Sequence, residues 1–274
     1  MAVAIDYKVS GPLTGLSEVN PVAVEGVPGD VVGICRLAPG LVIQPGDARR
    51  LGLPADRLSE NQIRPVGGLV EAILALNPAP LSVGREPEQR VIGTCRHFAV
   101  ISCALLRYRG IAARVRCGFA TYFQRGQGLD HWITEYWHAD EGRWVRIDSE
   151  ILGQSTLECP EDLRAGEFLS GGEAWIAFRE GRIDADSFGV YGTENWGPAE
   201  IRGNAVKDLA ALNKVEMLPW DVWGRMEAAY NGQTGADYDE LLDTVATTTA
   251  GDDLAAIAEL YAHDELRVPP ELIR

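Results

Sequence analysis

Hydrophobic and polar positions change their spacing along the chain, and these changes predict where helices and strands lie. From Cys95 onward, apolar residues recur at helical spacing. Gly93 and Thr94 interrupt the preceding segment, and Gly110 is well placed to end the run. We therefore expect a helix with Cys95 in its first turn. Its predicted apolar stripe consists of Phe98, Ile101, Leu105 and Tyr108.

Beyond Gly110 the spacing changes to alternation, which predicts strands. Residues alternate in character over 113–120, and two aromatic and β-branched stretches flank the turn residues 139–142. The second pattern predicts an antiparallel hairpin with His131 and Asp148 on its two strands. In an antiparallel pair, the numbers of directly opposed residues have a constant sum. The two side chains lie on one face only if this sum is odd, and a sum of 279 would place His131 directly opposite Asp148. The loop composition leaves the register open.

Three regions follow from the pattern, and the first is a packing extension over residues 1–58. It is rich in Gly, Pro and Val. The predicted core covers 59–153 and includes a helix that stops at Asn77. Residues 154–274 form a predicted C-terminal subdomain or lid. The short elements expected before residue 59 are strands at 29–37 and 41–43 and a helix near 47–51.

The segment after residue 153 is mostly helical in its pattern. It carries four of the seven tryptophans, and aromatic stripes on helices usually belong to a core. The alternative is that these helices form a cap over a cleft. The candidate lid element of such a cap consists of Asn213, Lys214, Glu216, Trp220 and Asp221. The expected helices lie within 172–181, 204–216, 220–232, 238–249 and 252–266.

The candidate chemistry lies in a thiol, an imidazole and a carboxylate on separate elements, which are Cys95, His131 and Asp148. At a helix N-terminus the sulfur meets unpaired N–H groups and the positive end of the dipole, which lower the thiol pKa. One N–H group can also bind an oxyanion. An imidazole can take the thiol proton while a carboxylate orients the ring. The trio therefore predicts thiol-based acyl transfer.

These residues together resemble the transglutaminase-like superfamily. The resemblance rests on Gly93, Cys95, the segment 106–119, the His131–Trp132 pair and Asp148, and it covers about residues 64–149. More narrowly, the chain is similar to a bacterial subgroup with the runs GTCR, RCGF and DHWITEYW. The resemblance implies an α+β, papain-like core, in which a nucleophile helix packs on an antiparallel sheet, together with a Cys-His-Asp triad and a C-terminal helical subdomain.

Residues around the triad bear on the substrate. His97 stands where relatives often carry an acid, and Trp132 directly follows the histidine of the triad, so both should lie beside the thiol. Arg96 and Arg116 are further candidates for substrate binding, because each could bind an acidic group of a substrate. For Arg116, a salt bridge within the protein is the simpler expectation. Gln62 is a candidate second oxyanion donor, but its spacing from Ser59 is also that of a capping box that starts a helical turn.

The implied reaction passes through an acyl-enzyme thioester formed from an amide, ester or thioester substrate. Water would then release an acid, and hydrolysis of a peptide or other amide bond is the default expectation. An amine acceptor would instead give an amide, as in a transglutaminase-type or specialised-metabolite acyltransferase. From another class, the chain could be an inactive binding scaffold. No cofactor is expected.

Charge and cysteine usage exclude several classes of partner. A net charge of −15 argues against nucleic acid or an anionic membrane as a partner. The sequence lacks an apolar run of membrane-spanning length or a basic segment before one, so we expect a cytoplasmic protein. Five cysteines without framework spacing fit reduced thiols. No metal is expected, because Cys95, His97, Cys117 and His131 lack metal-ligand spacing, and no EF-hand loop is present.

Overall fold

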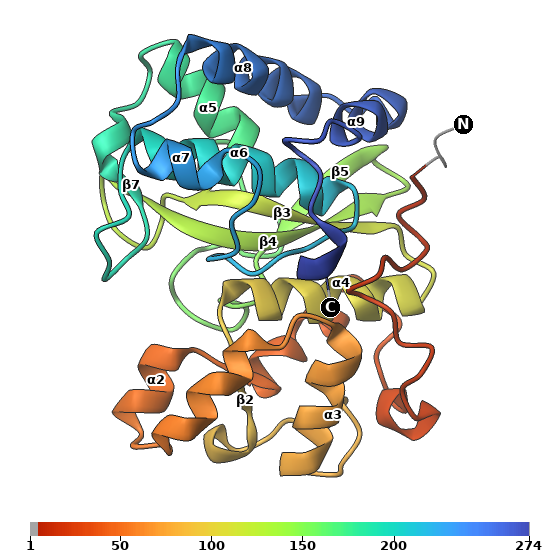
Figure 1. The fold of residues 1–274 in the computed structure, drawn as a ribbon. Coiled ribbons are helices and arrows are strands. Elements are labelled where there is room, and N and C mark those ends of the chain that lie inside the picture. The colour runs from red at the N-terminus through yellow and green to blue at the C-terminus, as the bar shows by residue number, and fades with distance from the viewer. Residues whose placement is uncertain (1–4, 274) are drawn as a thin grey trace. The chain divides into compact units, whose positions relative to one another are not determined.

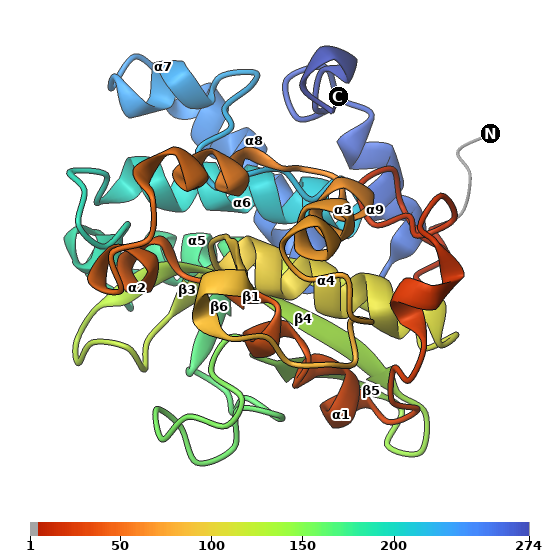
Figure 2. The ribbon, with the colours of Figure 1, turned by 90° about the horizontal axis from the view of Figure 1, so that it is seen from below.

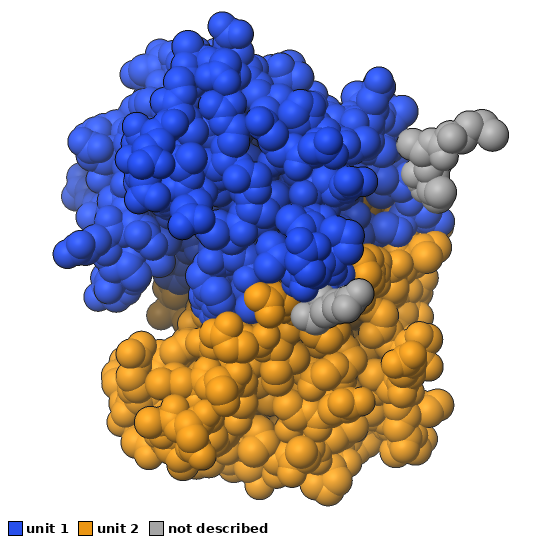
Figure 3. Space-filling model, in the orientation of Figure 1, with its two compact units in different colours: residues 1–6, 116–132, 164–274 blue, residues 7–115, 133–163 orange. Residues whose placement is uncertain are grey.

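The computed structural model describes residues 5–273, which fold as a mixture of helices and strands (Figure 1). The contacts within the chain define two compact units (Figure 3). Unit 1 comprises residues 1–6, 116–132 and 164–274, and unit 2 comprises residues 7–115 and 133–163. Each unit collects stretches that are distant in sequence. The boundaries predicted at residues 58 and 153 therefore stay predictions.

The larger sheet has the strand order β5-β4-β3-β6, and β7 pairs in parallel with β4. The β4–β5 pair is an antiparallel hairpin in which Thr134 opposes Ile147 and His138 opposes Arg143. The hairpin and its turn at 139–142 are confirmed, and the predicted α+β class is confirmed with them. The strands are β3 (Ala113–Ala120), β4 (Gly128–His138), β5 (Arg143–Ile147), β6 (Phe168–Ser170) and β7 (Phe188–Gly189).

The register of the hairpin differs from the direct pairing considered above. Opposed residues sum to 281 rather than 279, so the two strands are shifted by two residues. The sum is still odd. The paired residues end with Thr134 and Ile147, and residues 148–150 lie beyond them, the last two in a turn. The common face of His131 and Asp148 therefore stays a prediction, for which the odd sum meets the condition.

Unit 2 is built around α4, which is buried along almost its whole length. α1, α3 and the 3-10 helix η2 pack against it (Figure 2). Every α4 residue except Tyr108 is buried, so burial extends well beyond the predicted apolar stripe. Tyr108, which was predicted to belong to that stripe, is half exposed. The elements of unit 2 before the hairpin are η1 (Pro21–Val24), α1 (Val31–Cys35), η2 (Ala38–Gly40), β1 (Val42–Ile43), α2 (Pro45–Arg50), η3 (Ala55–Gln62), α3 (Val66–Leu76), η4 (Pro87–Gln89), β2 (Val91–Ile92) and α4 (Cys95–Tyr108).

The strand predicted at 29–37 is wrong, because the segment forms the short helix α1. Asp30 is its N-cap residue, and the Asp30 side chain accepts a hydrogen bond from Gly33 N at 2.7 Å. That bond satisfies an amide that a helix start otherwise leaves unpaired, so it favours helix over strand in an apolar run. The neighbouring predictions of a strand at 41–43 and a helix near 47–51 are confirmed by β1 and α2.

Unit 1 carries the predicted C-terminal helices, of which α5, α6 and α8 pack closely on one another (Figure 1). Two adjacent glycines permit this approach. A Cβ on Gly171 would lie 2.1 Å from Asn204 O, and one on Gly172 would lie 2.3 Å from Thr249 Oγ1. The helices are α5 (Gly171–Arg179), η5 (Ala185–Ser187), α6 (Pro198–Leu212), α7 (Met226–Tyr230), α8 (Ala236–Ala250), α9 (Leu254–Tyr261) and η6 (Pro270–Leu272). Within residues 5–273, none of the helices is long and apolar enough to cross a membrane.

Candidate active site

Cys95 is the first residue of α4, as the sequence predicts. Thr94 precedes it as the N-cap residue, with φ −92° and ψ 179°. The first amides of a helix have no partner within the helix, and the helix dipole is positive at this end. The thiol is 7% exposed, so little water screens these groups. The amides and the dipole favour a thiolate and burial opposes it, so activation of Cys95 stays a prediction.

His131 lies on β4 within unit 1, and two aromatic rings of the preceding loop contact it. The ring centroids of Tyr122 and Phe123 lie 6.2 and 5.0 Å from the imidazole centroid, both in edge-on arrangements. The imidazole is 3% exposed. These contacts restrict the orientations open to the ring and shield it from water.

Asp148 directly follows β5 in unit 2 and is held by backbone hydrogen bonds. Its amide donates to Pro160 O at 2.9 Å, and its Oδ1 accepts from the amide of Glu150 at 3.0 Å. The carboxyl group is buried. The odd sum of the hairpin register meets the condition for Asp148 and His131 to share a face, and the role of Asp148 in orienting the imidazole stays a prediction.

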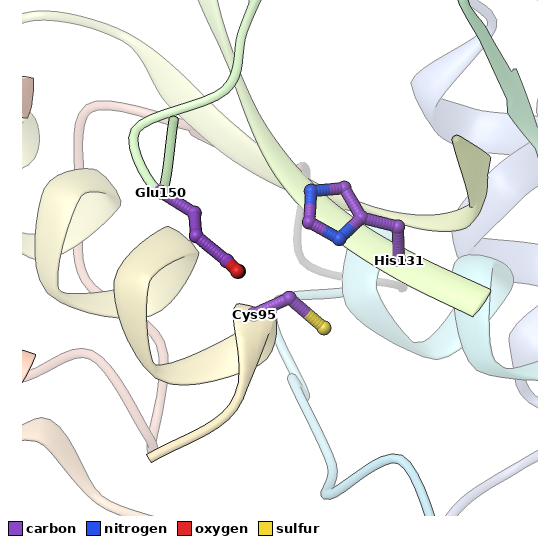
Figure 4. A group of neighbouring side chains, drawn as sticks. All are labelled: Cys95, His131 and Glu150. Carbon is purple, nitrogen blue, oxygen red and sulfur yellow. The ribbon is translucent and has the colours of Figure 1, made fainter. Parts of the chain in front are cut away.

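Glu150 is a site residue that the sequence analysis missed. The Cys95 thiol sulfur, a His131 ring nitrogen and a Glu150 carboxylate oxygen all lie within 4.8 Å of one another (Figure 4). Gln44 Nε2 donates to Glu150 Oε1 at 2.8 Å, which fixes the carboxylate. No local sequence pattern marks Glu150, which lies in the turn after β5, beyond the paired residues of the hairpin.

The same three groups are of the types that bind zinc, namely thiolate, imidazole and carboxylate. The three atoms lie within 4.8 Å of one another, so the group is a candidate metal site as well as a thiol beside a base and an acid. The expectation that no metal binds stays a prediction.

His97 and Arg96 do not take the substrate-facing positions considered for them. Both side chains are fully buried. His97 Nδ1 accepts from the amide of Thr94 at 3.0 Å, and its Nε2 lies 3.2 Å from Ile63 O. The Arg96 guanidinium donates to Arg64 O at 2.7 Å. Burial, and then the charge of Arg96, lowers the pKa of His97 to about 3. The imidazole is therefore neutral.

The side chains of Arg116 and Trp132 are also buried. Arg116 Nε and Nη2 donate to the two carboxylate oxygens of Asp208 at 2.9 and 2.7 Å, so the simpler expectation of a salt bridge is confirmed. Trp132 is 1% exposed and, as the neighbour of His131 on a strand, projects to the opposite face. Neither position supports direct contact with a substrate.

Gln62 ends the 3-10 helix η3 instead of starting a helical turn. Ser59 lies inside that helix, where its hydroxyl donates to Asp56 O, so the capping-box interpretation is wrong. The Gln62 side chain is exposed, and its Nε2 donates to Asn61 Oδ1 at 2.8 Å. The predicted oxyanion role of Gln62 gains no support from this arrangement and stays a prediction.

In the comparisons with known proteins, one family model matches part of the chain. The family model described as transglutaminase-like superfamily matches residues 81–149. This range begins before β2 and ends directly after Asp148, so it includes α4 and the β4–β5 hairpin. No curated protein and no solved structure matches the chain.

Proposed function

We propose that this chain, in which residues 81–149 form a domain of the transglutaminase-like superfamily, is an enzyme that transfers acyl groups through a cysteine thioester. That superfamily generally includes cysteine-dependent enzymes. In this proposal Cys95 is the nucleophile, His131 the general base and Asp148 the group that orients the imidazole.

The position of Cys95 is the observation that carries the proposal. It is the first residue of a 14-residue helix and is 7% exposed, and the amides of a first helical turn have no partner within the helix. A structural cysteine gains nothing from this position. A nucleophile gains a lower thiol pKa and an N–H donor for the oxyanion of the tetrahedral intermediate.

The proposed acylation step uses all three residues, and His131 acts in it first as a base and then as an acid. His131 takes the Sγ proton of Cys95, and the thiolate attacks the carbonyl carbon of an amide, ester or thioester. The carbonyl π electrons move to oxygen, where the helix amides stabilise the charge. When this intermediate collapses, the imidazolium returns the proton to the leaving group. Asp148 stabilises the imidazolium during this sequence.

The acceptor in the second step decides the class of enzyme. Water gives hydrolysis of a peptide or other amide bond, which is the default. The amide-forming alternative is favoured by Glu150, because a carboxylate within 4.8 Å of the sulfur can orient an amine acceptor and take up its proton. If an amine is the acceptor, the ratio of amide to acid product rises with the concentration of added amine.

Trapping of the acyl-enzyme tests the proposal. The protein is mixed with p-nitrophenyl acyl esters, quenched in acid and analysed by intact-mass and peptide mass spectrometry. We expect one acyl group on Cys95, and amide formation with an added primary amine that is faster in the wild-type protein than in Cys95→Ala would identify an acyltransferase. Acylation that is unchanged in Cys95→Ala would contradict the proposal, and absence of any adduct at Cys95 would favour the inactive scaffold.

The Asp148→Asn variant is expected to keep the fold and lose most of the activity. The amide oxygen of asparagine can still accept from Glu150 N, but it cannot stabilise an imidazolium. We expect kcat to fall by about 10²- to 10⁴-fold with little change in unfolding free energy. Asp162→Asn, which removes an exposed carboxylate bound to Arg143, is the matched control. Equal kinetics in the two variants would remove Asp148 from the triad.

A further inference from the structure

Two aromatic side chains of the loop between β3 and β4 lie against the imidazole of His131. The ring centroid of Phe123 is 5.0 Å from the imidazole centroid, and that of Tyr122 is 6.2 Å from it. The centroids of the two aromatic rings are 4.7 Å apart. All three residues belong to unit 1. The proposed general base therefore lies beside a continuous aromatic surface.

Backbone hydrogen bonds hold the loop that carries these rings at both of its ends. At the start of the loop, the Thr121 amide donates to Glu167 O at 3.0 Å, and the Thr121 hydroxyl donates to Gly166 O at 2.8 Å. Near its end, the Gln127 amide donates to Gln124 O at 3.1 Å. The two rings are therefore carried by a loop with a defined conformation.

Phe123 is the accessible part of this aromatic surface. It is 38% exposed, whereas the imidazole that it contacts is 3% exposed. A single exposed aromatic residue is ordinary on a protein surface, but this one contacts a proposed catalytic group. Leu129 is buried and precedes His131 by two positions on β4, so it projects to the same face of the sheet. A group that approaches the imidazole therefore meets apolar side chains.

In the proposed reaction, the imidazole determines where the leaving group lies. The imidazolium returns its proton to the leaving group, so the leaving atom has to come within hydrogen-bond reach of the ring. The acceptor that replaces the leaving group gives its proton to the same imidazole and has to occupy the same place. The acyl chain is joined to the thiol and has no such requirement. The surface beside the imidazole therefore selects the leaving group and the acceptor.

We propose that Phe123 is a specificity-determining residue, whose ring binds an apolar, aromatic substituent of the leaving group and of the acceptor. Offset or edge-on contact between two aromatic rings is favourable beyond the burial of their area. A hydrophilic substituent at the same place would lose water without gaining a partner on this surface. This inference rests on the proposed function, because only a reaction at Cys95 brings a leaving group to His131.

Turnover of two thioesters by the full chain tests the inference. S-benzyl thioacetate and S-(2-hydroxyethyl) thioacetate share one acyl group, and their leaving thiols are similar in acidity, but only the first carries an aromatic ring. The readout is kcat/KM for release of each thiol, divided by the rate constant of the same thioester with free cysteine. Peptide mass spectrometry identifies the acetyl group on Cys95.

Three variants separate the ring of Phe123 from a general effect of substitution. Phe123→Ala removes the ring, and Phe123→Tyr keeps it. Tyr191→Ala is the matched control, because it removes an aromatic ring that is 76% exposed in the turn after β7. Circular dichroism checks the fold of each variant.

We expect the wild-type protein to prefer the benzyl thioester, and Phe123→Ala to lower this preference by about 3- to 10-fold. Phe123→Tyr and Tyr191→Ala should retain it. A preference that is absent from the wild-type protein, that survives in Phe123→Ala, or that falls equally in all three variants would overturn the inference and leave the proposed function standing. Thiol release without any acetyl group on Cys95 in the wild-type protein would overturn both.

Discussion

Replacement of Cys95 by alanine is expected to abolish turnover while leaving the fold intact. The variant loses the atom that forms the thioester, so kcat should fall on the order of 10⁴- to 10⁶-fold. Alanine is a good helix former, so α4 should still begin at the same residue. The measurement is hydrolysis of an activated ester, with circular dichroism as the check of folding.

The matched control for this prediction is Cys159→Ala. Cys159 is a free, partly exposed cysteine outside the regular elements, and its removal should leave kcat unchanged. Cys35 suits this purpose less well, because it is fully buried and burial raises the pKa of its thiol. Turnover that survives in Cys95→Ala at the wild-type rate would exclude Cys95 as the nucleophile.

The Lys207→Met variant in unit 1 is expected to be much less stable than the wild-type protein. The Lys207 ammonium is buried, donates to Pro219 O, and lies 3.8 Å from Glu200 Oε1. Burial raises the pKa of both Glu200 and Asp130, although the lysine opposes each shift. Without the cation, two carboxyl groups share an interior site. We expect the unfolding free energy to fall by about 3–5 kcal/mol, measured by urea denaturation at pH 7.

A compensating variant and a change of pH test the cause of that loss. Adding Glu200→Gln to Lys207→Met removes one buried charge and should recover most of the stability. Carboxyl groups whose pKa is raised in the folded state bind protons there more tightly than in the unfolded chain. The deficit of Lys207→Met relative to wild type should therefore be largest at neutral pH and shrink as pH falls toward about 4. A deficit that is independent of pH, with no recovery in the double variant, would contradict this explanation.

The elements that local sequence determines were predictable. The start of α4 follows from Gly93, Thr94 and the apolar spacing, and the hairpin follows from two β-rich stretches around a polar turn. Both signals lie within about twenty residues of sequence. The family resemblance was found in the same segment, which the family model also matches.

Features that depend on register or on distant partners were not predictable. Glu150 lies in a turn beyond the paired residues of the hairpin, and no local pattern encodes its approach to Cys95 and His131. The pairing of Arg116 with Asp208 joins residues that are 92 positions apart. His97 was misjudged for a different reason, since it forms a capping box with Thr94 and histidine is not among the residues that usually mark one.

The short apolar segment that forms α1 illustrates a further limit of sequence patterns. A run of four to eight apolar residues fits a buried strand and a buried helical turn equally well. The choice here depends on one side chain, Asp30, which caps the helix through Gly33 N. That bond can be recognised only when the helix is already assumed.

The most direct test of the central claim is the rate of iodoacetamide alkylation of each cysteine against pH, in the wild-type protein and in His131→Ala. An activated Cys95 should label selectively, with an apparent pKa well below the ordinary value of about 8.5, and His131→Ala should raise that pKa. If Cys95 instead labels as slowly as Cys159, with the same profile in both proteins, the thiol is not activated and the proposed enzyme mechanism is contradicted.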